Sequence, residues 1–248
     1  MAGWLNRLLG GAKTPPLPPS MTDEELLALV APYRRRAIAL DLAEAAPNTP
    51  AASSWHGRVC LAAPGEDWPR HEGRPMSPVC QINLTTLPFV PEVVADLALI
   101  TLFIDPEAEL YDEPNGRGWC LCAYRSLDGL VPLADPRHEE DFVVGLLAAT
   151  VIEGDLPHDE DLPVELPDDM LDRYIDLGET TMLLKLGGWP QWVQGSLFVE
   201  EPEPITRALA LEVAAHSDGW YMGDGSAYIL RYPAGSEHGE WRLLTQIT

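Results

Sequence analysis

The sequence predicts an α+β protein made mostly of antiparallel sheet, folded as a pseudo-symmetric single domain of two units with a few helices. Residues 79–84 alternate apolar and polar side chains and residues 97–104 are almost continuously apolar, which predicts one half-buried strand and one fully buried strand. Asp224-Gly225 lies between two apolar stretches, which is a strong hairpin signal. Similar parts also recur in the same order in both halves of the chain.

The recurrence pairs a Trp-Pro element, a strand and a second apolar strand in each half. Trp68-Pro69 corresponds to Trp189-Pro190, residues 80–83 correspond to 211–214, and residues 99–104 correspond to 228–232. We therefore predict two similar sheet units, at about residues 55–135 and 180–244, within one domain that covers residues 21–248. A single domain of this length buries roughly three quarters of its unfolded surface.

The first 20 residues are expected to lie outside this domain. Residues 1–13 have an amphipathic pattern and residues 14–20 are a proline-rich spacer. Two interpretations stay open for this tail: a frayed end, or a short helix that docks on a partner or a membrane surface. It is too short to span a membrane and lacks the features of a signal peptide, so we expect a cytoplasmic protein without stable membrane insertion.

A helix is predicted to begin after Thr22, because Thr22 and Glu25 have the spacing of a capping box. Its apolar side is expected to continue to Ile38 and Leu40, with a kink or break at Pro32. The basic residues 34–36 are then interpreted as a solvated helix face that pairs with the acids of the chain.

Further elements follow from local patterns. Residues 119–125, 208–214 and 227–232 are predicted strands, and a short helix is predicted at 170–177. Residues 142–152 contain both β-branched residues and helix formers, so strand and helix both stay open there.

The four cysteines are Cys60, Cys80, Cys120 and Cys122. The last two are separated by one residue of a predicted strand, which puts their thiols on the same face. No second pair or histidine set stands at zinc-site spacing, so we interpret the cysteines as buried, reduced thiols and predict no metal and no cofactor.

Four motifs occur in an order that resembles the YwqG-like family of bacterial domains of unknown function. They are Gly73-x-Pro75-Met76 leading into residues 81–88, residues 102–105, residues 185–190 with Gln194, and residues 222–225 before Tyr228. The resemblance covers roughly residues 55–244. It implies a mixed fold dominated by antiparallel sheet, no established catalytic residues, and for some members a role as immunity proteins beside toxin genes. The acidic insertion at 154–177 departs from the family pattern.

The formal net charge of −23 is the outlying property of the composition. Such a field repels nucleic acid and acidic membranes, and it accelerates encounter with basic partners. We therefore exclude DNA or RNA binding. An acidic surface that serves solubility alone stays the alternative to a basic protein partner.

No common catalytic signature is present: the sequence lacks a GxSxG elbow, a Walker A loop, a GxGxxG turn opening a helix, and HExxH. His216 and Asp224 are candidates for a polar pocket between the two units, with a loop end and a turn residue as the alternative interpretation. The sequence thus favours a protein that is not an enzyme, with an enzyme as the alternative.

The leading hypothesis is a binding protein, most concretely an immunity protein that blocks a basic bacterial toxin. Tryptophans would provide the hold and carboxylates would steer the partner. The candidate contact residues are Asp155, Asp159, Glu160, Asp161, Asp168, Asp169, Trp189, Trp192 and Trp220. The alternatives are a small-ligand binder or enzyme with a pocket between the units, and a housekeeping scaffold without any toxin.

Overall fold

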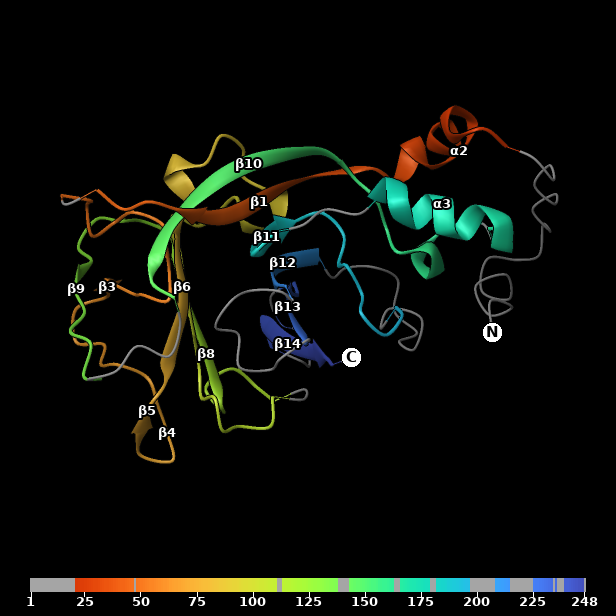
Figure 1. Ribbon diagram of the computed structural model, residues 1–248. Coiled ribbons are helices and arrows are strands. Elements are labelled where there is room, and N and C mark those ends of the chain that lie inside the picture. The colour runs from red at the N-terminus through yellow and green to blue at the C-terminus, as the bar shows by residue number, and fades with distance from the viewer. Residues whose placement is uncertain are drawn as a thin grey trace.

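The computed structural model describes residues 21–46, 48–110, 113–137, 143–162, 166–178, 182–196, 208–214, 225–233, 235 and 239–247. The described part is mostly antiparallel sheet with two short α-helices, as the sequence predicts (Figure 1). Among the described residues, no helix is long and apolar enough to cross a membrane. The predicted tail of residues 1–20 lies outside the described residues.

Ten strands form one antiparallel sheet in the order β14-β13-β12-β11-β1-β10-β2-β6-β7-β8. Their bounds are β1 Arg35–Ala43, β2 Trp55–His56, β6 Ser77–Asn83, β7 Leu99–Ile104, β8 Trp119–Tyr124, β10 Gly145–Asp155, β11 Leu184–Gly187, β12 Ala208–Val213, β13 Ser226–Arg231 and β14 Trp241–Gln246. Two small ladders complete the strands: β3 Leu61–Ala62 pairs with β9 Val131–Pro132, and β4 Arg70–His71 pairs with β5 Arg74–Pro75.

The first helix, α2 Asp23–Val30, begins at the predicted capping box. The Thr22 side chain accepts a hydrogen bond from the Glu25 N–H, and the Glu25 carboxylate accepts one from the Thr22 N–H at 2.8 Å. The helix ends at Val30 and passes into the 3₁₀ turn Ala31–Tyr33, which contains Pro32. The expected break at Pro32 is thus confirmed.

The prediction that the helical pattern continues to Ile38 and Leu40 is wrong. Both residues lie in β1, where Ile38 is paired with Val151 of β10 and Leu40 with Ala149. Arg35 and Arg36 accordingly begin a strand, and the open assignment of residues 142–152 is decided as strand over most of its length. The long ribbon of β1 and β10 arches across the molecule and joins its two halves (Figure 1).

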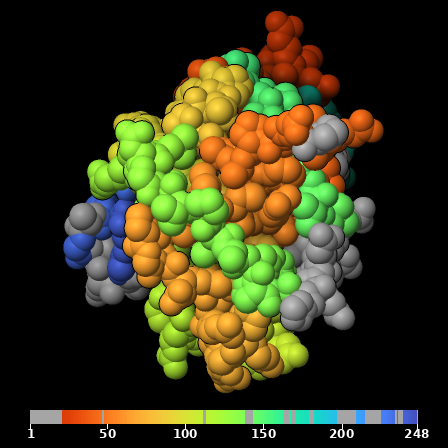
Figure 2. Space-filling model, turned by 90° about the vertical axis from the view of Figure 1, so that its left-hand side faces the viewer, coloured from red at the N-terminus to blue at the C-terminus, as the bar shows by residue number. Residues whose placement is uncertain are grey.

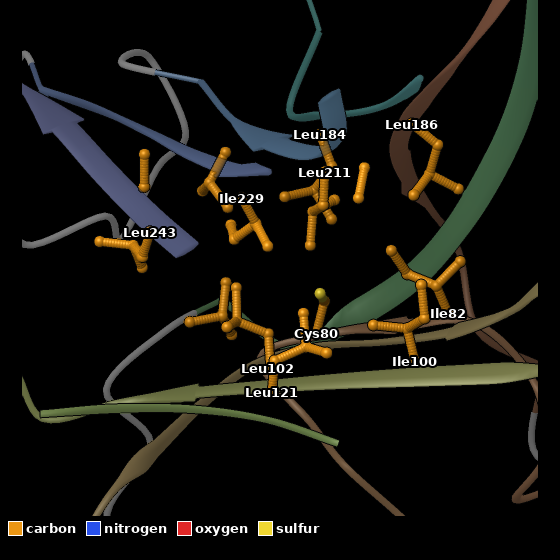
Figure 3. Packing of buried hydrophobic residues seen from close by; sticks show 14 of the residues in the cluster. Cys80, Ile82, Ile100, Leu102, Leu121, Leu184, Leu186, Leu211, Ile229 and Leu243 are labelled. Carbon is orange, nitrogen blue, oxygen red and sulfur yellow. The ribbon is translucent and has the colours of Figure 1, made fainter. Parts of the chain in front are cut away.

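The main core fills the space between the two groups of strands. In Figure 3, apolar side chains of β11 to β14 point toward those of β6, β7 and β8. The sheet also approaches closure, because the Thr245 hydroxyl on β14 donates to the Leu110 carbonyl and Pro114 forms a bridge with Arg242. The two ends of the strand order therefore meet through the segment between β7 and β8.

Strand β6 corrects another expectation. The alternating pattern of residues 79–84 predicts one buried face, but all seven residues of β6 are buried. Its polar side chains are satisfied by the preceding chain: Gln81 Oε1 accepts from the N–H groups of Cys60 and Leu61 at 2.9 and 3.1 Å, and Asn83 Nδ2 donates to the Ala52 carbonyl at 2.7 Å. The alternation thus reflects hydrogen bonding to a covering segment rather than contact with water.

The second helix, α3 Asp168–Gly178, packs beside α2 at one end of the molecule (Figure 1). Its Tyr174 joins Leu26 and Val30 of α2 in a separate small core, and its Arg173 forms an ion pair with Asp23. The predicted short helix is confirmed, and it begins at Asp168, two residues before the expected start.

Candidate functional site

A cavity with a volume of about 310 Å³ lies against β8. Figure 2 shows the face of the molecule that is formed in part by the orange segments before β6 and the green segments around β9. The cavity is lined by Leu61, Ala62, Glu66, Asp67, Pro69, Arg70, Met76, Thr101, Phe103, Gly116, Cys120, Cys122, Tyr124 and Leu133. Its volume is at the lower end of the range found for small-molecule sites.

The alternation of β8 places its reactive side chains in this cavity. Trp119 and Leu121 are buried in the main core, whereas Cys120, Cys122 and Tyr124 lie on the opposite face and line the cavity. The predicted common face of the two thiols is confirmed, and their sulfur atoms are 3.8 Å apart. The expectation that all four cysteines are buried is wrong, because Cys60, Cys120 and Cys122 are only partly buried.

The two thiols shift each other's pKa in opposite directions. The hydrogen bond with Cys120 is the largest influence on Cys122 and lowers the pKa of that thiol, although burial opposes the shift. The same hydrogen bond, together with burial, raises the pKa of the Cys120 thiol. Of the two thiols, Cys122 is therefore the one that ionises more readily.

Two further polar groups converge on the thiols. The Tyr124 hydroxyl donates to Glu66 Oε2 at 2.7 Å, and burial is the largest cause that raises the pKa of this phenol. The Thr101 side chain is almost fully buried beside Cys122, and its hydroxyl interacts with the Cys122 thiol and lowers the pKa of that thiol.

Trp68 packs against two of the apolar residues that line the cavity. Its indole Nε1 donates to the Met76 carbonyl at 2.8 Å, and its ring meets Phe103 edge to face with centroids 5.1 Å apart. Met76 and Phe103 themselves line the cavity. The apolar half of the cavity is thus held by a packed aromatic cluster.

A second, more polar cavity of about 250 Å³ lies on the other side of the β4–β5 hairpin. At its edge His71 Nδ1 and Arg74 are 2.8 and 3.0 Å from Asp105 Oδ2. Burial opposes ionisation of Asp105, but hydrogen bonds from the Glu107 N–H, His71 and Arg74 outweigh it and lower the pKa of the carboxyl group. Arginines and glutamates both line this cavity, so its charge selects neither anions nor cations.

A third cluster is buried around Lys185, which is 0% exposed. Its Nζ is 3.4 Å from Asp155 Oδ2 and 3.4 Å from Glu212 Oε2, and it donates to the Trp189 carbonyl. We call Lys185, Asp155 and Glu212 the buried charge cluster. Desolvation is the largest cause that raises the pKa of both carboxyl groups, and the attraction of Lys185 opposes it.

The structure puts several sequence-predicted contact residues into this interior rather than on a surface. Asp155, Trp189 and Trp192 are 3%, 6% and 6% exposed. Asp155 accepts from the Trp189 N–H at 2.6 Å, and Asp161 accepts from Trp192 Nε1 at 2.9 Å. These acids and tryptophans form hydrogen bonds with one another in the chain after β11. The predicted exposed aromatic patch at Trp189 and Trp192 is wrong, because both side chains are buried.

The remaining predicted residues divide into three groups. Asp159 and Glu160 lie in the 3₁₀ turn Asp159–Asp161, where Glu160 accepts from the Ser196 N–H at 2.7 Å. Asp168 and Asp169 begin α3. Trp220, His216 and Asp224 lie outside the described residues, as does the turn at 224, so the polar pocket predicted from them is untested.

Sequence reasoning missed the cavity at β8. Cys120 and Cys122 carried the right signal, a shared strand face, but the walls that make a cavity of that face come from distant segments. Among the described residues, no group of three or more His, Cys, Asp or Glu side chains is arranged to hold a metal ion. A scan against protein-family models finds no match for this chain, and a search of curated proteins finds no relative.

Proposed function

We propose that this chain is a binding protein for a small, partly apolar molecule, which it takes into the cavity beside β8. The observation that carries this proposal is the convergence of Cys122 and Tyr124 on a cavity that is also lined by the apolar side chains of Met76, Phe103 and Leu133. Cavities with a few convergent polar groups on apolar walls are the usual form of small-molecule sites.

Filling this cavity is expected to abolish binding. In L133W the indole would occupy space between β9 and β8, so small aromatic alcohols and amines should bind at least about tenfold more weakly, a loss of about 1.4 kcal/mol. Saturation-transfer NMR on a defined mixture of such compounds measures this. The matched control is L42W on β1, where Leu42 is 42% exposed. Equal binding by L133W and the wild type, or no binding by the wild type, would contradict the proposal.

A basic protein partner, such as the toxin of an immunity pair, is our second proposal. The net charge of −23 supports it, and so does an exposed side of α3 where Asp172 and Asp176 flank Ile175, which is 53% exposed. An apolar side chain rimmed by carboxylates is suited to a basic surface. The buried Trp189 and Trp192 are not part of this version of the proposal.

Charge reversal on α3 tests the second proposal. D172K/D176K is expected to reduce capture of a stoichiometric basic protein at physiological salt by about tenfold or more, because both the attraction and its salt dependence weaken. Mass spectrometry identifies and quantifies the captured protein. E44K/D128K reverses two exposed acids outside α3 and serves as the control. Capture that is equal in all three proteins would remove α3 as the contact.

We also propose that the domain consists of two related units, and the strand order supports this. Outward from β10 the chain runs β2, β6, β7, β8, and outward from β1 it runs β11, β12, β13, β14. In the sequence β1 precedes the group β2 to β8, but it pairs with β11 of the other group. Likewise β10 precedes the group β11 to β14, but it pairs with β2. The correspondence of β6 with β12 and of β7 with β13 matches the repeat in the sequence. We also propose that the chain is a member of the YwqG-like family, on the four motifs described in the sequence analysis.

A further inference from the structure

The two cavity-facing thiols are spaced to share one atom. A disulfide requires about 2.05 Å between sulfurs, well below the 3.8 Å observed between Cys120 Sγ and Cys122 Sγ. Two sulfurs that bind one centre at about 2.3 Å are about 3.8 Å apart at a tetrahedral angle, and they lie closer together at the narrower angles of a pyramidal centre. A small rotation of the two side chains therefore lets the pair bind one soft atom without movement of β8.

The protonation of the pair favours the same chemistry. Thiolates rather than thiols bind soft centres, and the hydrogen bond between the two sulfurs lowers the pKa of the Cys122 thiol. Met76 and Phe103 line the same cavity and give it an apolar part. Soft sulfur ligands in such surroundings select thiophilic centres over hard cations such as magnesium or calcium.

The number of protein ligands limits which kind of centre the two sulfurs can bind. Within the described ranges no third His, Cys, Asp or Glu joins the thiols in a metal-holding group, so the closed four-ligand arrangement of structural zinc is not built there. A centre that brings its own substituent needs only two sulfurs. The 310 Å³ cavity gives such a substituent room against Phe103 and Leu133.

From this geometry we infer that Cys120 and Cys122 form a dithiol site for a soft, thiophilic centre that carries an organic substituent, with trivalent organoarsenicals as the type compound. The inference rests on the proposed binding function of the same cavity. With an arylarsine oxide, each sulfur forms one bond to arsenic, the arsenic–oxygen bond breaks, and the two thiol protons leave with that oxygen as water. Arsenic stays trivalent, so no oxidant or reductant is needed.

Phenylarsine oxide tests the inference directly. The reduced wild-type protein is expected to bind one phenylarsenic per chain, seen by intact-protein mass spectrometry, and to release it to 2,3-dimercaptopropanol but not to a monothiol. C120S and C122S should each bind at least about 100-fold more weakly, because the second sulfur adds an intramolecular contact. C60S, which changes another partly buried cysteine, should bind as the wild type does.

A second readout uses the wild-type protein alone and does not depend on the folding of the variants. Bound phenylarsenic should protect the peptide with Cys120 and Cys122 from N-ethylmaleimide while Cys60 is still alkylated. Unchanged binding by C122S, or protection of Cys60 instead, would overturn the inference. The two proposals fail separately: L133W tests the cavity with compounds that need no thiol, and the serine variants keep the cavity volume while they remove the sulfur pair.

Discussion

Replacement of Lys185 by methionine is expected to lower the free energy of unfolding by about 3–5 kcal/mol, the usual cost when a buried ion pair loses one partner. Lys185 is completely buried between two carboxylates that are themselves 3% and 1% exposed. Methionine preserves most of the volume but leaves Asp155 and Glu212 facing each other without the ammonium group. Both carboxylates also hold backbone N–H groups of the following turn, at Trp189 and Gln191, so they cannot turn away freely.

Urea unfolding followed by circular dichroism measures this loss. The control is R125M, which removes the exposed ion pair between Arg125 and Asp96 and is expected to cost no more than about 1 kcal/mol. Similar losses in K185M and R125M would show that the buried charge cluster contributes little to stability.

The pH dependence of K185M provides a sharper test. Burial raises the folded-state pKa of Asp155 and of Glu212 above the ordinary value, so the folded state binds more protons than the unfolded state between those values. Stability from such groups is present at low pH and is lost as the pH rises through the folded pKa. Without Lys185 both pKa values rise further. The cost of K185M should therefore be larger at pH 8 than at pH 5, and an equal cost at both would contradict the assignment.

Local patterns predicted the strands whose signal is complete within a short window. The apolar runs of β7, β8, β12 and β13 and the capping box of α2 needed no distant information, and the structure confirms them. Strand β1 was mistaken for a helix because its apolar residues follow a capped helix at compatible spacing. Its extended form is decided by pairing with β10 and β11, both far away in the sequence.

The candidate site shows the same limit. A pair of cysteines two residues apart on a strand is visible in the sequence, but the cavity over it needs β3, β9 and the segment with Trp68, which only tertiary structure brings together. The prediction that Asp155 is an exposed contact residue was wrong for a related reason. Composition alone makes Asp155 a solvated charge, whereas its burial is compensated by Lys185 from another strand. Partners of this kind leave no local pattern.

Substitution of Gly188 by alanine is the second change for which we expect a large effect. Gly188 has a φ of +72°, and a Cβ there would lie 2.1 Å from Asp155 Oδ2 and 2.8 Å from the Ala37 Cβ. The backbone strain of a left-handed residue adds to the overlap, so we expect a loss of about 3 kcal/mol or more, measured by urea unfolding. The overlapping carboxylate is held by the Trp189 N–H and cannot move without breaking that bond.

G65A separates the two causes, because Gly65 has a φ of +86° but no atom within 4 Å of an added Cβ. It should lose only about 1–2 kcal/mol from backbone strain. If G65A and G188A lost the same free energy of unfolding, the overlap between the added Cβ at position 188 and Asp155 would contribute nothing to the loss. Because G188A displaces the same carboxylate that K185M leaves unpaired, the double variant should lose less than the sum of the single losses, as expected for residues of one network. Additive losses would instead separate the turn at Gly188 from the buried charge cluster.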